Sequence, residues 1–492
     1  MRLHWEKIHR NNRLQISTIV FLTSVILIAP QPMKASAADY SKASVTASEN
    51  ISTEITASGI KIYLDTFRPN MDLFANFSLH VNATLSATDK SVVSVNNTNG
   101  ILQFHFKFGS YLTSSAKSTP LATVKDGSGT PRIQVFGMPK DFPIPSITGS
   151  KSAISDLNFL TTPTTNEGAY AIATKGLNVV FFVKSPRFIV GFRELSDAKS
   201  NSFPSGTPRY AYLEQKQLNH ESLSPGIWKF LDSTFELVGR VNTFNALGQV
   251  LQSDGHDMTI SPDGNPVVMT IPTRSVDSSW LAKPYSGPIV DCLVAEVSNG
   301  ETTKSFSLWD WANSHRSEAK ALLDAGLRDA DPAQPTGPSD ICHANSIQYY
   351  APANEYLLSS RSLSALFILD SNLTTVKSIL SSPGSMQHFA RFTSKNQITV
   401  LGNYTQDKSS RFQTWNLING NWELSETTLP IHVLYCGNAQ MIDKSHLWVG
   451  GGCQAFAKNT LGVLYDVSGP NPTEVARLMA SSMGYAYRTD IY

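Results

Sequence analysis

A histidine, an amide and a guanidinium are brought together by one predicted hairpin in the C-terminal half of the chain. The first strand carries His343 and Asn345, and residues 351–354 form a turn that leads back to Arg361. If residues pair across this turn with numbers that add to about 705, Arg361 lies level with His343 and Asn345. Such a set of hydrogen-bond donors suits an anionic, tetrahedral group. The alternative is that His343 and Arg361 are ordinary residues of a half-buried sheet.

Two further histidines occupy similar positions. His256 lies in the sequence Asp-Gly-His-Asp, and His388 follows Gln387. Each stands at the start of a predicted strand, with a turn about seven residues later. The three histidines are therefore expected to play related structural roles.

Together these stretches resemble the arylsulfotransferases that work without a phosphosulfate nucleotide. The family pattern is an aspartate, two variable residues, a histidine, one variable residue and asparagine-serine, then a leucine-serine-serine-arginine return and a later glutamine-histidine pair. The chain carries these residues in the same order: Asp340, His343, Asn345, Ser346, Ser360, Arg361, Gln387 and His388. The similarity runs from about residue 168 to the C-terminus and is strongest from 255 to 403.

The resemblance implies an aryl-sulfate sulfotransferase that moves a sulfuryl group from a phenolic sulfate ester to a phenol in a ping-pong cycle. By the same resemblance His388 is the nucleophile and becomes a sulfohistidine, while His256, His343, Asn345 and Arg361 hold the sulfuryl oxygens. One protonated histidine would exchange a proton with the phenol. No cofactor is implied, and the expected partners are small aryl sulfates and phenols.

The chain departs from the family pattern directly after the nucleophile, where the family often has an aspartate and this chain has Phe389. An acidic neighbour would orient the imidazole or adjust its pKa, so the departure leaves the rate open. Two other functions remain open. One is a non-catalytic secreted propeller that serves as a binding or adhesion module. The other is a three-histidine, metal-dependent hydrolase, against which Arg361 weighs because a guanidinium is repelled by a divalent cation.

Composition and the N-terminal sequence indicate an exported protein, either secreted or periplasmic. The chain has 492 residues, a net charge of +1 and 16% charged residues, against a usual value of ~25%, and offers no electrostatic case for nucleic acid. Basic residues precede an apolar run of 14 residues, 16–29, and a small-residue cleavage site follows at 35–37. Residues 1–37 are therefore expected to be a secretory signal peptide, with no membrane span after its removal.

Hydrophobic alternation predicts an all-β protein. Residues 38–150 are expected to form a β-sandwich-like domain and 151–167 a linker. From 168 to 492, strand-turn-strand units begin near Gly168, Arg209, His256, His343, His388 and Cys436. All intervals but one are near the ~40–50 residues of a propeller blade, so a six-bladed β-propeller is expected, as the resemblance also implies. A helical excursion at 312–339, with a helix at 317–327, fills the longer interval.

In a propeller, the first strand of each blade lines the central channel. His256, His343 and His388 start strands in three different blades. We therefore expect their side chains to meet at one mouth of the channel, joined there by Arg361 and Asn345.

The four cysteines all lie in the C-terminal half, and an exported setting favours disulfides. Cys436 and Cys453 flank a predicted hairpin, 437–452, that places them opposite each other. This pairing leaves Cys292 with Cys342. The alternative is free, buried thiols.

Overall fold

The computed structural model describes residues 40–78, 86–87, 92–98, 101–195, 203, 205–216, 225–281, 288–326, 339–404, 409–433, 435–452, 459–481, 483–484 and 486–492. The expected signal peptide, 1–37, lies outside these residues. Residues Asp39 to Tyr492 form one compact unit in which strands are the predominant secondary structure. Across the described part of the chain, no helix has the length and apolar character needed to cross a membrane.

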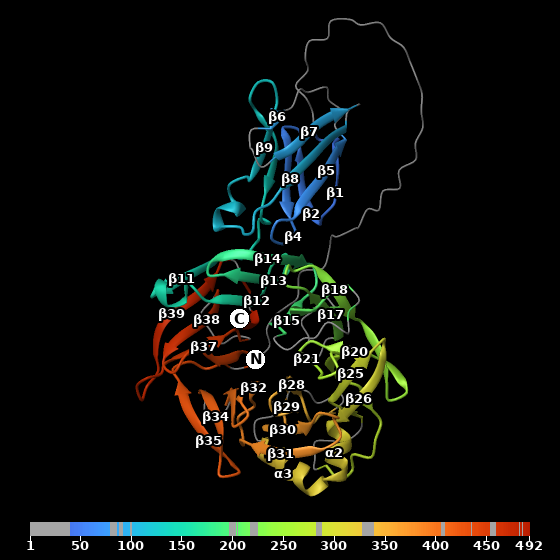
Figure 1. Cartoon of the computed structure of the whole chain (residues 1–492), viewed down its shortest axis with the longest axis vertical. Coiled ribbons are helices and arrows are strands. Elements are labelled where there is room, and N and C mark those ends of the chain that lie inside the picture. The colour runs from blue at the N-terminus through green and yellow to red at the C-terminus, as the bar shows by residue number, and fades with distance from the viewer. Residues whose placement is uncertain are drawn as a thin grey trace, which may run out of the picture. The chain divides into compact units, whose positions relative to one another are not determined.

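Two sheets are formed by the first third of the chain (Figure 1). One has the order β1 (Ser44–Ala47), β5 (Asp72–Ser78), β8 (Ile101–Lys107) and β7 (Val92–Thr98). The other has the order β2 (Ile51–Thr56), β3 (Gly59–Leu64), β10 (Pro131–Phe136), β9 (Ala122–Lys125) and β6 (Ser86–Ala87). In β8 the buried side chains of Leu102, Phe104 and Phe106 alternate with more exposed residues, as the sequence pattern predicts.

The following sheets carry most of the chain. The first has the order β4 (Thr66–Phe67), β14 (Asn178–Ser185), β13 (Gly168–Lys175), β12 (Asn158–Thr165) and β40 (Ala486–Ile491). A ten-stranded sheet has the order β15 (Ile189–Glu194), β16 (Tyr210–Gln215), β17 (Pro225–Leu231), β20 (Gln249–Asp254), β19 (Thr243–Ala246), β26 (Glu301–Ser307), β25 (Leu293–Ser298), β22 (Pro266–Thr270) and β21 (Met258–Ile260), with β18 (Leu237–Val241) on β17. A small sheet joins β23 (Thr273–Arg274), β24 (Ile289–Val290) and β27 (Ser339–Asp340).

Three more sheets complete the described architecture. They are β28 (Ala344–Tyr350), β29 (Glu355–Ser360), β30 (Ala365–Asp370) and β31 (Val376–Ser381); β32 (His388–Ser394), β33 (Gln397–Gly402), β34 (Ser410–Ile418) and β35 (Asn421–Leu429); and β11 (Pro145–Gly149), β39 (Thr473–Ala480), β38 (Thr460–Asp466), β37 (His446–Gly450) and β36 (Asn438–Met441). The helical segments are η1 (Ser114–Lys117), α1 (Lys151–Ile154), α2 (Leu308–Ser314) and α3 (Arg316–Gly326). Helix α3 occupies the residues for which the sequence predicts a helix.

One strand from each of several successive sheets contacts its counterpart in the next sheet (Figure 1). Strands β12 and β40 contact β15, strand β21 contacts β28, and β28 contacts β32. Strands β32 and β40 both contact β36. We call these seven strands the inner strands.

The expected linker, 151–167, is wrong for most of its length, because β12 lies inside it and pairs with β40. The prolines of this region suggested a connection, but Pro163 sits where the pairing with β40 shifts register. A proline is tolerated at such a bulge because no ladder hydrogen bond is needed there. Residues 145–149, expected in the N-terminal domain, form β11 and pair with β39. The repeat units expected at Gly168 and Arg209 therefore begin one strand earlier, at β12 and β15.

A single buried carboxylate, that of Asp257, joins four of the inner strands. It accepts hydrogen bonds from Arg193 of β15 at 2.5 Å, from Arg391 of β32 at 2.8 Å and from the backbone N–H of Ile347 in β28 at 3.1 Å. Arg488 of β40 lies 3.9 Å away. Burial alone would raise the pKa of Asp257, but the three guanidiniums outweigh it and lower the pKa to about 2.

Replacing this carboxylate should destabilise the protein strongly. In Asp257→Asn, three largely buried guanidiniums lose the counter-charge of the fully buried carboxylate, and breaking such a buried pair costs about 3–5 kcal/mol. Urea unfolding measures the loss. The matched control is Asp263→Asn, because Asp263 is 59% exposed and pairs with Lys304, so its loss should cost under about 1 kcal/mol. Equal losses in the two variants would show that Asp257 does not hold the strands together.

Candidate active site

The hairpin that carries His343 and Arg361 has the predicted register. Ile347 pairs with Leu358, one of the pairs whose numbers add to 705. The turn at 351–354 closes the hairpin, and the backbone N–H of Arg361 donates to the carbonyl of His343 at 3.0 Å. The prediction that Arg361 lies level with His343 is confirmed.

The imidazole of His343 is held from behind by Asp340. Its Nδ1 lies 2.5 Å from Asp340 Oδ2, and its backbone N–H donates to Asp340 Oδ1 at 2.8 Å. These two bonds support the left-handed backbone of His343, which has a φ of 42°. Burial lowers the pKa of His343, and Arg361 and His256 act in the same direction, outweighing the opposite effect of Asp340.

His256 has the same arrangement one sheet earlier. Its Nδ1 lies 2.5 Å from Asp254 Oδ1, which also accepts its backbone N–H at 2.9 Å. The ring stands edge-on to that of His343, with 5.1 Å between the ring centroids, and 5.8 Å from the ring of Tyr487. In both histidines, a carboxylate on Nδ1 leaves Nε2 as the free nitrogen.

His388, the first residue of β32, is held differently. Its Nδ1 lies 2.7 Å from Asn403 Oδ1 and 3.1 Å from the carbonyl of Met386. The amide nitrogen of Asn403 donates to the carbonyls of Val433 and Cys436 at 2.7 and 3.1 Å, which fixes its oxygen toward the imidazole. Both partners of Nδ1 accept hydrogen bonds, so Nδ1 carries the proton and Nε2 carries a lone pair.

The neutral form of His388 is strongly favoured. The side chain is 3% exposed, and burial is the largest cause of a pKa well below the usual value. Arg361, Arg488 and His343 lower the pKa further, outweighing the opposite effect of the Asn403 bond. At neutral pH this imidazole is therefore an uncharged base whose Nε2 is available for bond formation.

The structure brings together four of the five residues that the sequence singled out. His256 and His343 are in ring contact, and the charge of Arg361 acts on both His343 and His388. Asn345 differs, because its amide is fully buried and donates to the carbonyl of Gln387 at 2.6 Å. Asn345 thus positions the segment before His388.

Several contacts of this site escaped the sequence reasoning. Asp254 and Asp340 stand in the motifs, but neither was assigned as the partner of the histidine that follows it by two or three residues. Asn403 lies on the neighbouring strand connection, and nothing local marks it as a partner of His388. Tyr435, whose ring faces the guanidinium of Arg361 at 5.4 Å, is also unmarked.

Phe389, which stands where the family often has an aspartate, contributes a ring instead of a charge. It is 3% exposed and has a φ of 60°. The guanidinium of Arg391 lies 3.9 Å from its ring centroid and that of Arg488 5.1 Å. Since Asn403 accepts from Nδ1 of His388, orientation of this imidazole does not depend on an acid at position 389.

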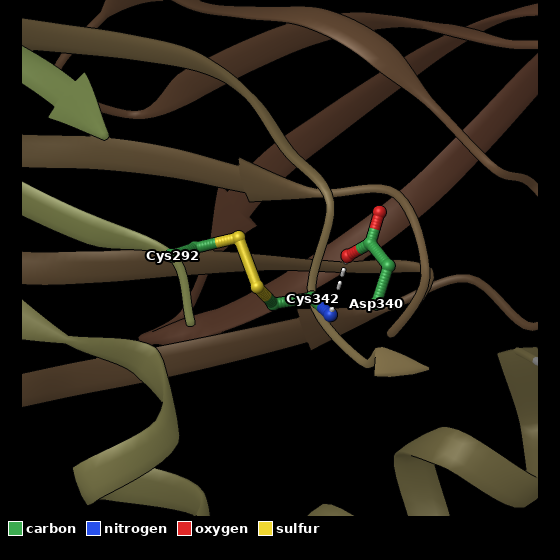
Figure 2. Close-up of side chains that lie close together, drawn as sticks. All are labelled: Cys292, Asp340 and Cys342. Carbon is green, nitrogen blue, oxygen red and sulfur yellow. Dashed lines mark hydrogen bonds between the residues drawn. A yellow bond between two sulfur atoms is a disulfide. The ribbon is translucent and has the colours of Figure 1, made fainter. Parts of the chain in front are cut away.

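A disulfide anchors the His343 segment to the preceding sheet (Figure 2). The predicted bridge between Cys292 and Cys342 is confirmed, with an S–S distance of 2.05 Å. Asp340, which holds His343, also accepts the backbone N–H of Cys342 at 3.3 Å. The predicted pair of Cys436 with Cys453 lies outside the described residues, because Cys453 is not among them.

In the described part of the chain, one group of three residues has possible metal-ligating atoms within 4.8 Å of one another: Cys292, Asp340 and Cys342. Figure 2 shows that its two sulfurs are bonded to each other, so they are not thiolate ligands. A separate cavity of about 750 Å³ lies between α2 and β31, lined by residues such as Trp311, His315 and Ile379. None of the histidines of the cluster lines this cavity, so it plays no part in their chemistry.

Comparisons with known proteins agree with the resemblance seen in the sequence. No curated protein matches the chain. Among solved structures, a 6-phosphogluconolactonase candidate from Bacteroides fragilis has 10% identity, covers 65% of this chain and 81% of its own, and gives a TM-score of 0.38. A hypothetical selenium-binding protein from Sulfolobus tokodaii has 11% identity, with 65% and 73% covered and a TM-score of 0.36. Similarities this weak carry no argument about fold.

Residues 226–460, which contain all three histidines and Arg361, match the family described as arylsulfotransferase (ASST). Over residues 226–460 the chain is therefore similar to the arylsulfotransferase family.

Proposed function

We propose that this protein moves a sulfuryl group from a phenolic sulfate ester to a phenol through a sulfohistidine on His388. One observation carries the proposal. Nδ1 of His388 is bound to two acceptors, so Nε2 holds a lone pair, and the low pKa keeps the imidazole neutral. A neutral imidazole with a free Nε2 is the form required of a nucleophile.

The transfer proceeds in two displacements at sulfur. Nε2 of His388 attacks, the S–O bond to the aryl group breaks, and a phenolate leaves. The oxygen of a second phenol then attacks the same sulfur, and the S–N bond breaks. Like phosphoryl transfer, each step spreads charge over three oxygens, which the guanidinium of Arg361 would stabilise.

His256 and His343 supply the proton transfers in this scheme. In both histidines a carboxylate on Nδ1 fixes the ring and leaves Nε2 to face the substrate, as in other histidine-carboxylate pairs. One of these histidines donates a proton to the departing phenolate and takes one from the incoming phenol. Asn345 acts here as a positioning residue, since its amide is bound to Gln387.

Tyr435 offers a surface for the aryl group. Its side chain is 36% exposed and lies against Arg361. Aromatic rings stack on such faces with modest gains beyond buried area. A phenyl ring resting there would lie next to the residues that hold its sulfate.

We also propose that the inner strands belong to a six-bladed β-propeller, with an N-terminal β-sandwich-like domain before it. The contacts between successive inner strands, and the pairing of β40 with β12, support a closed ring of sheets. Export from the cytoplasm is part of the proposal, because a disulfide persists in an oxidising compartment.

Exposure to p-nitrophenyl sulfate should add one sulfuryl group to the protein, as seen by intact mass. Release of nitrophenol should be faster with a phenol acceptor than with water alone, because the sulfohistidine must be discharged by a nucleophile. In His388→Ala, both the label and the release should disappear. His446→Ala is the matched control, since His446 also pairs with an aspartate but is an exposed residue outside the cluster.

Three outcomes would contradict the proposal. Release that does not depend on the acceptor would indicate a sulfatase. A label that persists in His388→Ala would assign the nucleophile elsewhere, and absence of any label or release in the wild type would favour a binding module.

Asn403→Asp should shift the pH profile of transfer. A carboxylate on Nδ1 raises the pKa of His388, so less neutral imidazole is present at a given pH and the acid limb moves to higher pH. At pH values below this pKa, each unit by which the pKa of His388 rises lowers the rate about tenfold. Asn438→Asp is the control, because Asn438 is also buried and bound to backbone, with no histidine partner. An unchanged acid limb in Asn403→Asp would count against His388 as the titrating nucleophile.

Chelating agents should leave the transfer rate unchanged. In the proposed mechanism, Arg361 and the histidines hold the sulfuryl oxygens, so removal of divalent ions has no target. The measurement is the rate of acceptor-dependent release before and after prolonged dialysis against EDTA. Loss of activity that returns on addition of zinc would instead support the three-histidine metal site.

A further inference from the structure

We propose that Arg488, on the C-terminal strand β40, is a second cationic ligand for the anionic group held at His388, alongside Arg361. The proposal rests on the proposed function and deepens it, because it adds a residue to the same site. The ligand class is a tetrahedral oxyanion: the sulfuryl group of an aryl sulfate, or free sulfate.

Arg488 is a buried cation whose hydrogen-bonding capacity is not filled. Its side chain is 4% exposed, and its Nη2 donates to the carbonyl of Asn345 at 2.6 Å. Within the described residues, its Nε has no hydrogen-bond partner. A buried, charged donor without an acceptor is costly, and such groups normally bind a counter-ion.

The neighbouring carboxylate does not fill this capacity. Arg193 and Arg391 bond directly to Asp257 at 2.5 and 2.8 Å, whereas the nearest nitrogen of Arg488 is 3.9 Å away. Three guanidiniums thus share Asp257 and the nearby Asp490. Burial raises the pKa of Asp490 to about 6, despite the arginines, so its carboxyl is still mostly ionised at neutral pH. Even then, three guanidiniums face only two carboxylates. At least one positive charge is left without a protein partner.

Two aromatic rings direct Arg488 toward the histidine cluster. Its guanidinium lies 5.1 Å from the ring centroid of Phe389, which follows the nucleophile, and 4.9 Å from that of Tyr487. Tyr487 in turn contacts His256. The charge of Arg488 also lowers the pKa of His388, which places it within electrostatic range of the nucleophile.

A purely structural role for Arg488 is the alternative, because its bond to Asn345 is one step from the segment that carries His388. The two roles predict different results. A cation that holds the anion affects sulfate affinity and the acid limb of His388 together, whereas a structural residue affects stability alone.

The test measures binding of inorganic sulfate to the full chain by titration calorimetry, together with the pH profile of transfer. Arg488→Met should weaken sulfate binding about tenfold or more, since a hydrogen bond to a charged group is lost. The same variant should move the acid limb to higher pH, because the loss of a nearby positive charge raises the pKa of His388. Arg488→Lys keeps the charge and should leave the limb near its wild-type position, with sulfate affinity between those of the other two proteins.

Arg477→Gln, on the preceding strand β39, is the matched control, because Arg477 pairs with Glu474 outside the histidine cluster. It should bind sulfate as the wild type does. A folded Arg488→Met variant with wild-type affinity and an unchanged acid limb overturns the inference. If that variant does not fold, wild-type affinity in Arg488→Lys overturns it.

Failure of the inference is distinct from failure of the proposed function. If the wild type forms no sulfohistidine but binds sulfate through Arg488, the anion site is supported and the proposed reaction is refuted. If sulfuryl transfer proceeds equally well in Arg488→Met, the reaction is supported and the role of Arg488 in it is refuted.

Discussion

A carboxylate removed from water is stable only where cations surround it, and Asp257 meets this condition by drawing its cations from different strands. Arg193, Arg391 and Arg488 arrive from β15, β32 and β40, and the backbone of β28 adds an N–H. No one of these strands can slide without exposing a buried charge. The residue before Asp257 is His256, so the same contact that holds the strands in register also fixes one histidine of the cluster.

The three imidazoles of the cluster differ in the hydrogen-bond partner of their Nδ1 atom. His256 and His343 have carboxylates on Nδ1, whereas His388 has an amide oxygen and a backbone carbonyl. A carboxylate stabilises an imidazolium, and a neutral acceptor does so much less. The three rings therefore differ in the group bound to Nδ1, which is a carboxylate for His256 and His343 and a pair of neutral oxygens for His388.

The sequence was sufficient where the determining signals are local. The turn at 351–354 and the strand alternation gave the register that aligns Arg361 with His343, and three histidines at strand starts indicated a common cluster. It failed where a contact joins residues that no local pattern connects, or where a residue such as proline suggested the wrong structure. Asn403 reaches His388 across a strand pair interrupted by a bulge, and the Pro163 bulge concealed β12. Arg488 has no motif around it, and its position follows only from the pairing of β40 with a strand more than 300 residues earlier.

That pairing carries a consequence for how the protein acquires its activity. Strand β40 is synthesised after every other described strand, yet it lies between β12 and β36. Until it emerges, β12 presents an unpaired edge, and such edges invite mispairing with other chains. Biogenesis of the site thus depends on synthesis of β40: a nascent polypeptide halted before residue 486 already has its three histidines, but neither the pairing of β12 with β40 nor Arg488.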